Sequence, residues 1–186
     1  RMIIGIIIVV ILIIVALWLV KAYNNFVKMK NKIEEAFATM DVYLKKRWDL
    51  VPNLVNTVKG YAAHEKETFE KIAGLRTRGY DSMSANEKIE ANQQMGSALG
   101  RLIATAEAYP DLKANTNFMD LQKQLTSLED DIANSRKYYN GCVREMNTAV
   151  ESFPSNIIAG MFHFERYKMY EVEDAAQRQN VTVDFS

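Results

Sequence analysis

The sequence contains few of the residues that build disulfides, metal sites and glycine-rich folds. Its 186 residues include one cysteine and two histidines, which excludes an internal disulfide and a cysteine-cluster metal site. Eight glycines and three prolines are too few for a collagen-like or propeller fold. No P-loop, GxGxxG, GxSxG or kinase signature occurs. We therefore expect no catalytic residue, no metal and no cofactor.

A surplus of charge of either sign is also missing. The chain has 23 basic and 23 acidic residues. Without Arg1 and Lys21, which flank an N-terminal apolar run, 21 basic residues remain against the 23 acidic ones. Proteins that bind nucleic acid normally carry a strong basic surplus. The charge balance therefore argues against nucleic acid as a partner.

The most distinctive feature that is present is the apolar run at residues 2–20, which has no charged or polar side chain. As a helix it is roughly 28 Å long, close to the roughly 30 Å of a bilayer's apolar core. It is longer than the apolar region of a signal peptide, and it ends in Trp18-Leu19-Val20-Lys21 without a small-residue cleavage pattern. The run therefore predicts a transmembrane anchor, with Trp18 at the headgroup interface.

Positive charges are concentrated on one side of this anchor. Lys21, Lys28, Lys30 and Lys32 follow the run, whereas Arg1 precedes it. By the positive-inside rule, the N-terminus lies outside and the remainder of the chain lies in the cytoplasm. The four lysines are also expected to face anionic lipid headgroups.

Residues 22–170 show apolar residues at helical spacing, and no stretch alternates with the period of a strand. Four helices are expected, at about residues 22–51, 53–78, 85–109 and 118–153. The third begins with a capping-box signature, Ser84 followed by Glu87. The fourth is the clearest, because apolar positions recur every three or four residues from Phe118 to Phe153.

Pro52 leaves two interpretations of the first half of this region. The apolar phase continues through it, which suits one long kinked helix, but proline inside a helix costs about 3 kcal/mol. A break at Pro52 gives four segments that can lie side by side. We therefore expect an all-α fold, in which the transmembrane helix at 2–20 is followed by an up-and-down four-helix bundle at 22–170. Residues 171–186 are polar and are expected to form a tail or a short strand.

Four blocks of the sequence resemble the LemA family. They are DVYLKKRWDLVPNLVNTVKGYAAHE (41–65), EAYPDLKANTNFMDLQKQL (107–125), SRKYYNGCVREMNTAVESFPSNIIAGMF (135–162) and VDF (183–185). The resemblance implies a single-pass protein of the bacterial cytoplasmic (inner) membrane, with the N-terminus outside and a four-helix bundle in the cytoplasm. It implies no reaction, cofactor or catalytic residue. The chain departs from the family pattern at His163, where the pattern favours glycine.

Three groups outside this pattern have both a structural and a chemical interpretation. His64-Glu65 begins like HExxH, but Thr68 holds the fifth position, so no metal is expected. Cys142 lies in the apolar series of the fourth helix, which favours a packed thiol over a nucleophile. The run Lys45-Lys46-Arg47 is interpreted as a solvated face, and a dock for an acidic partner is the alternative.

Residues 152–170 are unusually rich in apolar and aromatic side chains. The segment is interpreted either as completing the core at the end of the bundle or as an exposed surface that contacts the membrane or another subunit. In an up-and-down bundle the fourth helix returns toward the membrane, which places this segment beside the anchor. The candidate lipid or subunit contacts are Ile157, Ile158, Met161, Phe162 and Phe164.

The leading hypothesis is a non-enzymatic, membrane-anchored helical scaffold. It self-associates into a homo-oligomer and organises or shapes the membrane or its proteins, with lipid as a further partner. The alternative is an adaptor or regulator of a membrane-bound protease or another envelope protein. Both draw on what the resemblance implies, since magnetosome proteins resemble LemA and LemA members are often encoded beside membrane proteases.

Overall fold

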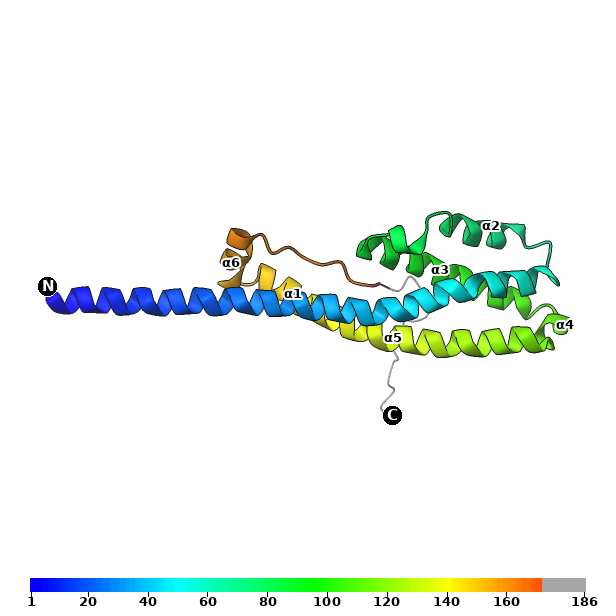
Figure 1. Cartoon of the computed structure of the whole chain (residues 1–186), viewed down its shortest axis with the longest axis horizontal. Coiled ribbons are helices and arrows are strands. Elements are labelled where there is room, and N and C mark those ends of the chain that lie inside the picture. Colours follow the sequence, from blue (N-terminus) through cyan, green and yellow to red (C-terminus); the bar gives the residue numbers. More distant parts are fainter. Residues whose placement is uncertain (172–186) are drawn as a thin grey trace, which may run out of the picture. The chain divides into compact units, whose positions relative to one another are not determined.

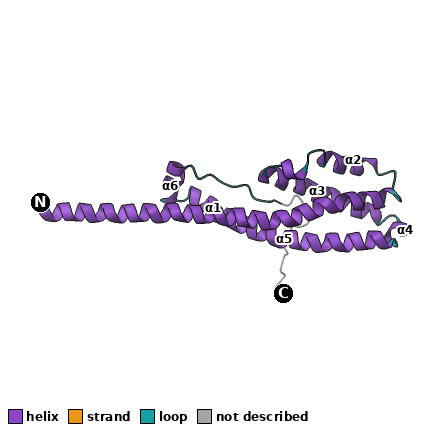
Figure 2. Ribbon diagram, viewed as in Figure 1, coloured by secondary structure: helices purple, strands orange, loops and turns teal. Residues whose placement is uncertain are grey.

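The computed structural model describes residues 1–171, and these contain helices but no strand (Figure 1, Figure 2). The all-α fold expected from the sequence is confirmed. The expected tail at 171–186 lies, apart from Glu171, outside the described residues. The elements are α1 (Met2–Lys59), α2 (Lys66–Leu75), the 3-10 helix η1 (Tyr80–Ser82), α3 (Ala85–Ala106), α4 (Pro110–Lys113), α5 (Thr116–Glu151) and α6 (Ser155–Phe162).

The chain divides into two compact units. Unit 1 comprises residues 1–39 and 135–169, and unit 2 comprises residues 40–134 together with Tyr170 and Glu171. The N-terminal part of α1, the C-terminal part of α5 and helix α6 therefore belong to unit 1. Helices α2, α3 and α4 belong to unit 2 with the remaining parts of α1 and α5.

Helix α1 continues through Pro52, so the expected break at this residue is wrong. Proline has no N–H group, and Pro52 therefore leaves the carbonyl of Trp48, four residues earlier, without its helical donor. In unit 2, Arg76 Nη1 donates a hydrogen bond to this carbonyl oxygen. The Arg76 guanidinium also lies over the Trp48 ring, with Cζ 5.2 Å from the ring centroid. A side chain from the end of α2 thus replaces the bond that proline removes.

The second expected helix is consequently divided between two elements. Its first residues belong to α1, its later ones to α2, and His64 and Glu65 lie in the turn that joins them. The third expected helix corresponds to α3, and its capping box is present. Ser84 N donates to Glu87 Oε2 over 2.8 Å, and Glu87 N donates to Ser84 Oγ over 3.4 Å. The Ser84 N–H and the Ser84 hydroxyl both donate to the Glu87 carboxylate and, together with Arg78, lower the pKa of Glu87 to about 2.

In unit 1, α1 and α5 pack as antiparallel helices. Lys32 Nζ donates to Glu145 Oε2 over 3.1 Å, and the rings of Phe37 and Tyr139 lie 6.0 Å apart. Residue numbers therefore rise along α1 as they fall along α5. Because of this direction, the C-terminal end of α5 lies toward the part of α1 that carries the apolar run. Cys142, on the same stretch of α5, is buried, which confirms it as a core residue.

Candidate functional site

The N-terminal part of α1 is the one described helix that is long and apolar enough to cross a membrane, judged by length and composition. None of its most apolar stretch is buried against the rest of the chain. Trp18, near the end of the apolar run, is 37% exposed. This stretch can bury its side chains only in surroundings outside the described fold, as a membrane anchor does.

Aromatic contacts attach the segment after α5 to α1, directly beyond the apolar run. The ring of Tyr23 lies 4.7 Å from that of Phe162 and 5.8 Å from that of Phe164, and Phe164 stacks on Phe26 at 4.8 Å. Tyr23 is only three residues past Val20, where the run ends. Helix α6 is therefore fixed beside the base of the apolar helix within unit 1.

Helix α6 is apolar on both of its sides. Ile158 and Ala159 face inward and are buried, so Ile158 does not belong to an exposed contact surface. Phe164 is half-buried against Phe26. We call the four exposed apolar side chains of this segment the α6 face, which includes Phe162 although its ring also contacts Tyr23; no charged residue occurs between Ser152 and Phe164. The four are Phe153 (81% exposed), Ile157 (49%), Met161 (61%) and Phe162 (49%).

The exposure of Phe153 was not predicted from the sequence. The helical spacing from Phe118 assigned this residue to the buried seam of the fourth helix. Helix α5 ends at Glu151, however, so the spacing no longer determines where Phe153 points. The sequence does indicate this helix end, because Pro154 directly follows Phe153.

His163 ends α6 in the left-handed conformation, with φ 57° and ψ 39°. Phe164 N then donates to Ala159 O over 2.9 Å, the bond that closes a Schellman turn. This turn directs Phe164 back onto Phe26. The position at which the chain departs from the family pattern is therefore one where the backbone conformation favours glycine.

Replacing His163 with glycine is expected to raise the free energy of unfolding by about 1 kcal/mol. The left-handed conformation costs a side-chain-bearing residue roughly 1–2 kcal/mol, and the greater freedom of glycine in the unfolded chain offsets part of the gain. Denaturant unfolding of the detergent-solubilised chain measures the change. His163→Ala serves as the control and should give no gain, since alanine carries the same strain; equal stabilisation by both variants would contradict the explanation.

The four lysines expected at the membrane surface differ in their surroundings. Lys30 lies 3.9 Å from Glu34, and Lys32 pairs with Glu145, whose hydrogen bond raises the pKa of Lys32. Lys21 and Lys28 are exposed and pair with no carboxylate of residues 1–171.

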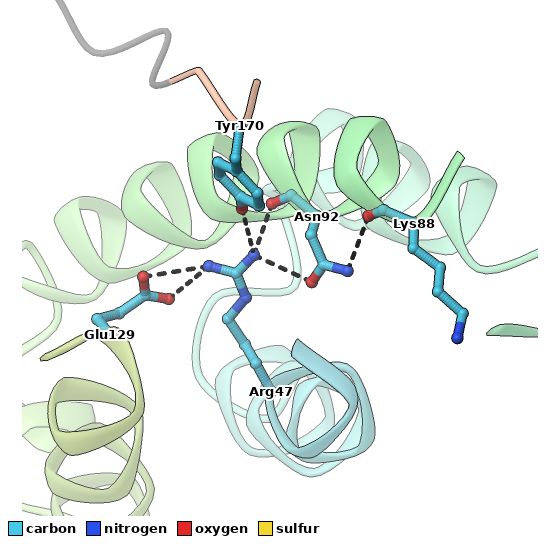
Figure 3. Close-up of polar contacts among 5 residues, drawn as sticks. All are labelled: Arg47, Lys88, Asn92, Glu129 and Tyr170. Atoms are coloured by element: carbon cyan, nitrogen blue, oxygen red, sulfur yellow. Dashed lines mark hydrogen bonds and ion pairs between the residues drawn. The ribbon is translucent and has the colours of Figure 1, made fainter. Parts of the chain in front are cut away.

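Arg47 lies at the centre of a buried polar cluster in unit 2 (Figure 3). Its Nη1 donates to both carboxylate oxygens of Glu129, over 2.8 and 3.1 Å, and Nη2 donates to the backbone oxygen of Asn92 over 2.6 Å. Longer contacts join Nη2 to Asn92 Oδ1 (3.0 Å) and to the Tyr170 hydroxyl (3.5 Å). Helix α3 passes close to the Arg47 guanidinium at Gly96, where an added Cβ atom would lie 3.3 Å from Nη1.

The interpretation of Lys45-Lys46-Arg47 as a solvated face is therefore wrong for Arg47, which is 2% exposed. Burial by itself lowers the pKa of Arg47, but its interactions with Tyr170 and Glu129 hold it above the ordinary value, so the guanidinium remains charged. Its bonds connect α1, α3, α5 and the chain at Tyr170. This cluster joins elements of unit 2: its Nη1 and Nη2 donors are directed at protein groups, and its Nε is buried without a hydrogen-bond partner among the described residues.

A second polar group in unit 2 surrounds Asp41. Tyr80 donates its hydroxyl to Asp41 Oδ1 over 2.6 Å, and Lys88 pairs with Oδ2 at 2.7 Å. Burial, followed by the bond to Asp41, raises the pKa of Tyr80. In residues 1–171 no three His, Cys, Asp or Glu side chains lie together in a way that could hold a metal ion.

These features define a class of protein: an all-helical chain with one apolar N-terminal helix, and with an apolar face beside the base of that helix. The model of the LemA family matches residues 36–185, and the chain belongs to the LemA family. Together with the apolar helix, this membership indicates a membrane-associated protein.

Curated relatives extend the comparison. Magnetosome protein MamQ 1 of Paramagnetospirillum magneticum is 25% identical over 190 residues, covering 88% of this chain and 70% of the relative. Protein LemA of Metamycoplasma hominis is 25% identical over 166 residues, covering 88% and 74%. Magnetosome protein MamQ of Magnetospirillum gryphiswaldense is 23% identical over 190 residues, with 88% and 70% covered.

Proposed function

We propose that this protein is a non-enzymatic, membrane-anchored helical scaffold that self-associates through its α6 face. The observation that carries the proposal is the exposure of Phe153, Ile157, Met161 and Phe162 beside the base of the apolar helix. Large apolar patches on soluble surfaces mark contact sites with proteins or membranes. Four such side chains next to an anchor are therefore suited to join copies of the chain held in the same membrane.

The proposal extends to what such an assembly does. Copies joined beside their anchors organise the lipid and the proteins between them, or impose a shape on the membrane. Two of the relatives above are named as magnetosome proteins, which is compatible with a role in organising a cellular structure. The alternative function is an adaptor for a membrane-bound protease or another envelope protein, which uses the same face for a different chain.

The size of the detergent-solubilised particle tests self-association. Light scattering after size-exclusion chromatography should give a mass of several 21.3 kDa chains, and Met161→Glu should reduce it toward one chain. Charge placed in an apolar interface leaves a buried carboxylate without a partner, which is strongly unfavourable. Met119→Glu is the matched control, because Met119 is similarly exposed (53%) on α5 in unit 2, outside the α6 face. It should leave the mass unchanged.

A single-chain particle for the unmodified protein would contradict self-association and would favour the adaptor function. An assembly that Met161→Glu and Met119→Glu disturb equally would contradict the assignment to the α6 face.

We also propose that the anchor spans the bacterial cytoplasmic membrane with its N-terminus outside. The support is the excess of lysine after the apolar run. In a Cys142→Ala chain with a single cysteine at position 186, an impermeant thiol reagent should label the protein only after the cells are opened. Ready labelling in intact cells would reverse the orientation, and a cysteine placed before Met2 serves as the externally exposed control.

A further inference from the structure

A groove of about 690 Å³ lies in unit 1 where the apolar run of α1 meets its first polar residues. Its apolar lining includes Leu17, Trp18 and Val20, and its polar lining includes Lys21 and Lys28. The far wall is formed by Pro154 and neighbouring residues at the junction of α5 and α6. The groove therefore offers apolar surface toward the membrane end and positive charge away from it.

The charges of this groove are not compensated by the surrounding protein. No acidic residue occurs before Glu34 in the sequence, and no Asp or Glu lines the groove. Lys30 and Lys32, which do not line it, are the juxtamembrane lysines that approach carboxylates. Of the four juxtamembrane lysines, Lys21 and Lys28 are the two that pair with no carboxylate of the described residues, and both line this groove.

We propose that this groove binds one anionic phospholipid of the surrounding membrane. Lys21 and Lys28 hold the phosphate-bearing headgroup, and Leu17 and Trp18 contact the upper part of an acyl chain. Residues seven apart lie on nearly the same side of a helix, about 10 Å apart along its axis, so both ammonium groups reach one headgroup. The proposal rests on the membrane placement proposed above, but not on self-association.

The occupant follows from the chemistry of the lining. A soluble anion would use the two lysines and leave the apolar wall wet, whereas a zwitterionic lipid would use the wall and leave the lysines unpaired. An anionic phospholipid satisfies both parts at once. Each lysine near an anionic lipid surface strengthens binding by a factor of about five.

Trp18 provides the readout, because it lines the groove and is one of two tryptophans in the chain. The full-length Trp48→Phe protein is reconstituted in phosphatidylcholine vesicles that contain a small fraction of dibrominated phosphatidylglycerol or dibrominated phosphatidylcholine. Bromine quenches tryptophan only at short range. We expect the brominated anionic lipid to quench Trp18 as if its association constant were about fivefold or more above that of the zwitterionic lipid. The same comparison with Trp48 retained should give the same order.

Matched variants separate the groove from general surface charge. Lys21→Gln with Lys28→Gln should bring the two association constants to near equality, whereas Lys30→Gln with Lys32→Gln removes the same charge and should leave the preference in place. An equal loss in both double variants, or equal quenching by the two lipids in the parent, would overturn the proposal. So would displacement of the lipid by soluble glycerol phosphate. Absence of quenching by both lipids would overturn the membrane placement as well, while the particle mass tests self-association separately.

Discussion

Replacing Arg47 with alanine is expected to lower the free energy of unfolding by about 2–3 kcal/mol, the cost of removing a buried charged donor, because Glu129 is 44% exposed and water solvates its carboxylate once Arg47 is gone. The substitution deletes the donors that Glu129 and the carbonyl of Asn92 accept from. The Asn92 carbonyl is buried with its residue and loses the closest of these bonds. A cavity in place of the guanidinium adds to the cost.

Denaturant unfolding of the detergent-solubilised chain, followed by circular dichroism, measures this change. Lys46→Ala is the matched control, because Lys46 is the neighbouring basic residue and is exposed. It is expected to change the free energy of unfolding by less than about 0.5 kcal/mol. Similar small effects of both substitutions would contradict the structural role given to Arg47.

Replacing Arg76 with alanine is expected to cost about 1–3 kcal/mol, because the carbonyl of Trp48 then has no donor. The cost should depend on Pro52. In a Pro52→Ala background, the alanine N–H can donate to the Trp48 carbonyl, as in an ordinary helix. Arg76→Ala should therefore cost at least about 1 kcal/mol less in that background than in the parent chain.

A double-mutant cycle measures this coupling, again by denaturant unfolding. Arg78→Ala provides the control, since Arg78 follows closely in sequence, is largely exposed and pairs instead with Glu87. Its cost should be the same with Pro52 or with alanine. If Arg76→Ala costs the same in both backgrounds, Arg76 does not substitute for the missing helical bond.

Periodicity was a sound guide wherever the helix carried its own signals. The capping box at Ser84 and Glu87 placed the start of α3, and the regular apolar series from Phe118 placed α5. Pro52 was misjudged for a physical reason. The cost of a proline depends on whether another group satisfies the orphaned carbonyl, and here that group is Arg76, which is distant in sequence. No local pattern contains this information.

The candidate site was predictable in part. The apolar density after Pro154 singled out α6, but the side on which each residue lies depends on how the helix docks, and Ile158 lies on the buried side. The burial of Arg47 could have been predicted from its spacing to apolar neighbours, but its charge favoured a solvated position. Arg47 follows the buried Leu44 by three residues and precedes the buried Val51 by four, the spacing of an inward-facing position.

The continuity of α1 has a consequence for how the length of the anchor is constrained. Within unit 1 no break separates the apolar run from the core residues Phe26 and Ile33. The directions in which the side chains of the run point around the helix axis are therefore fixed relative to those of the core residues. Each added or deleted residue near Val20 turns one part against the other by about 100°. Such an indel would present a different side of the anchor to the groove and to the α6 face. Natural variation in anchor length should therefore be tolerated toward the N-terminal end of the run, and not at its junction with the folded part.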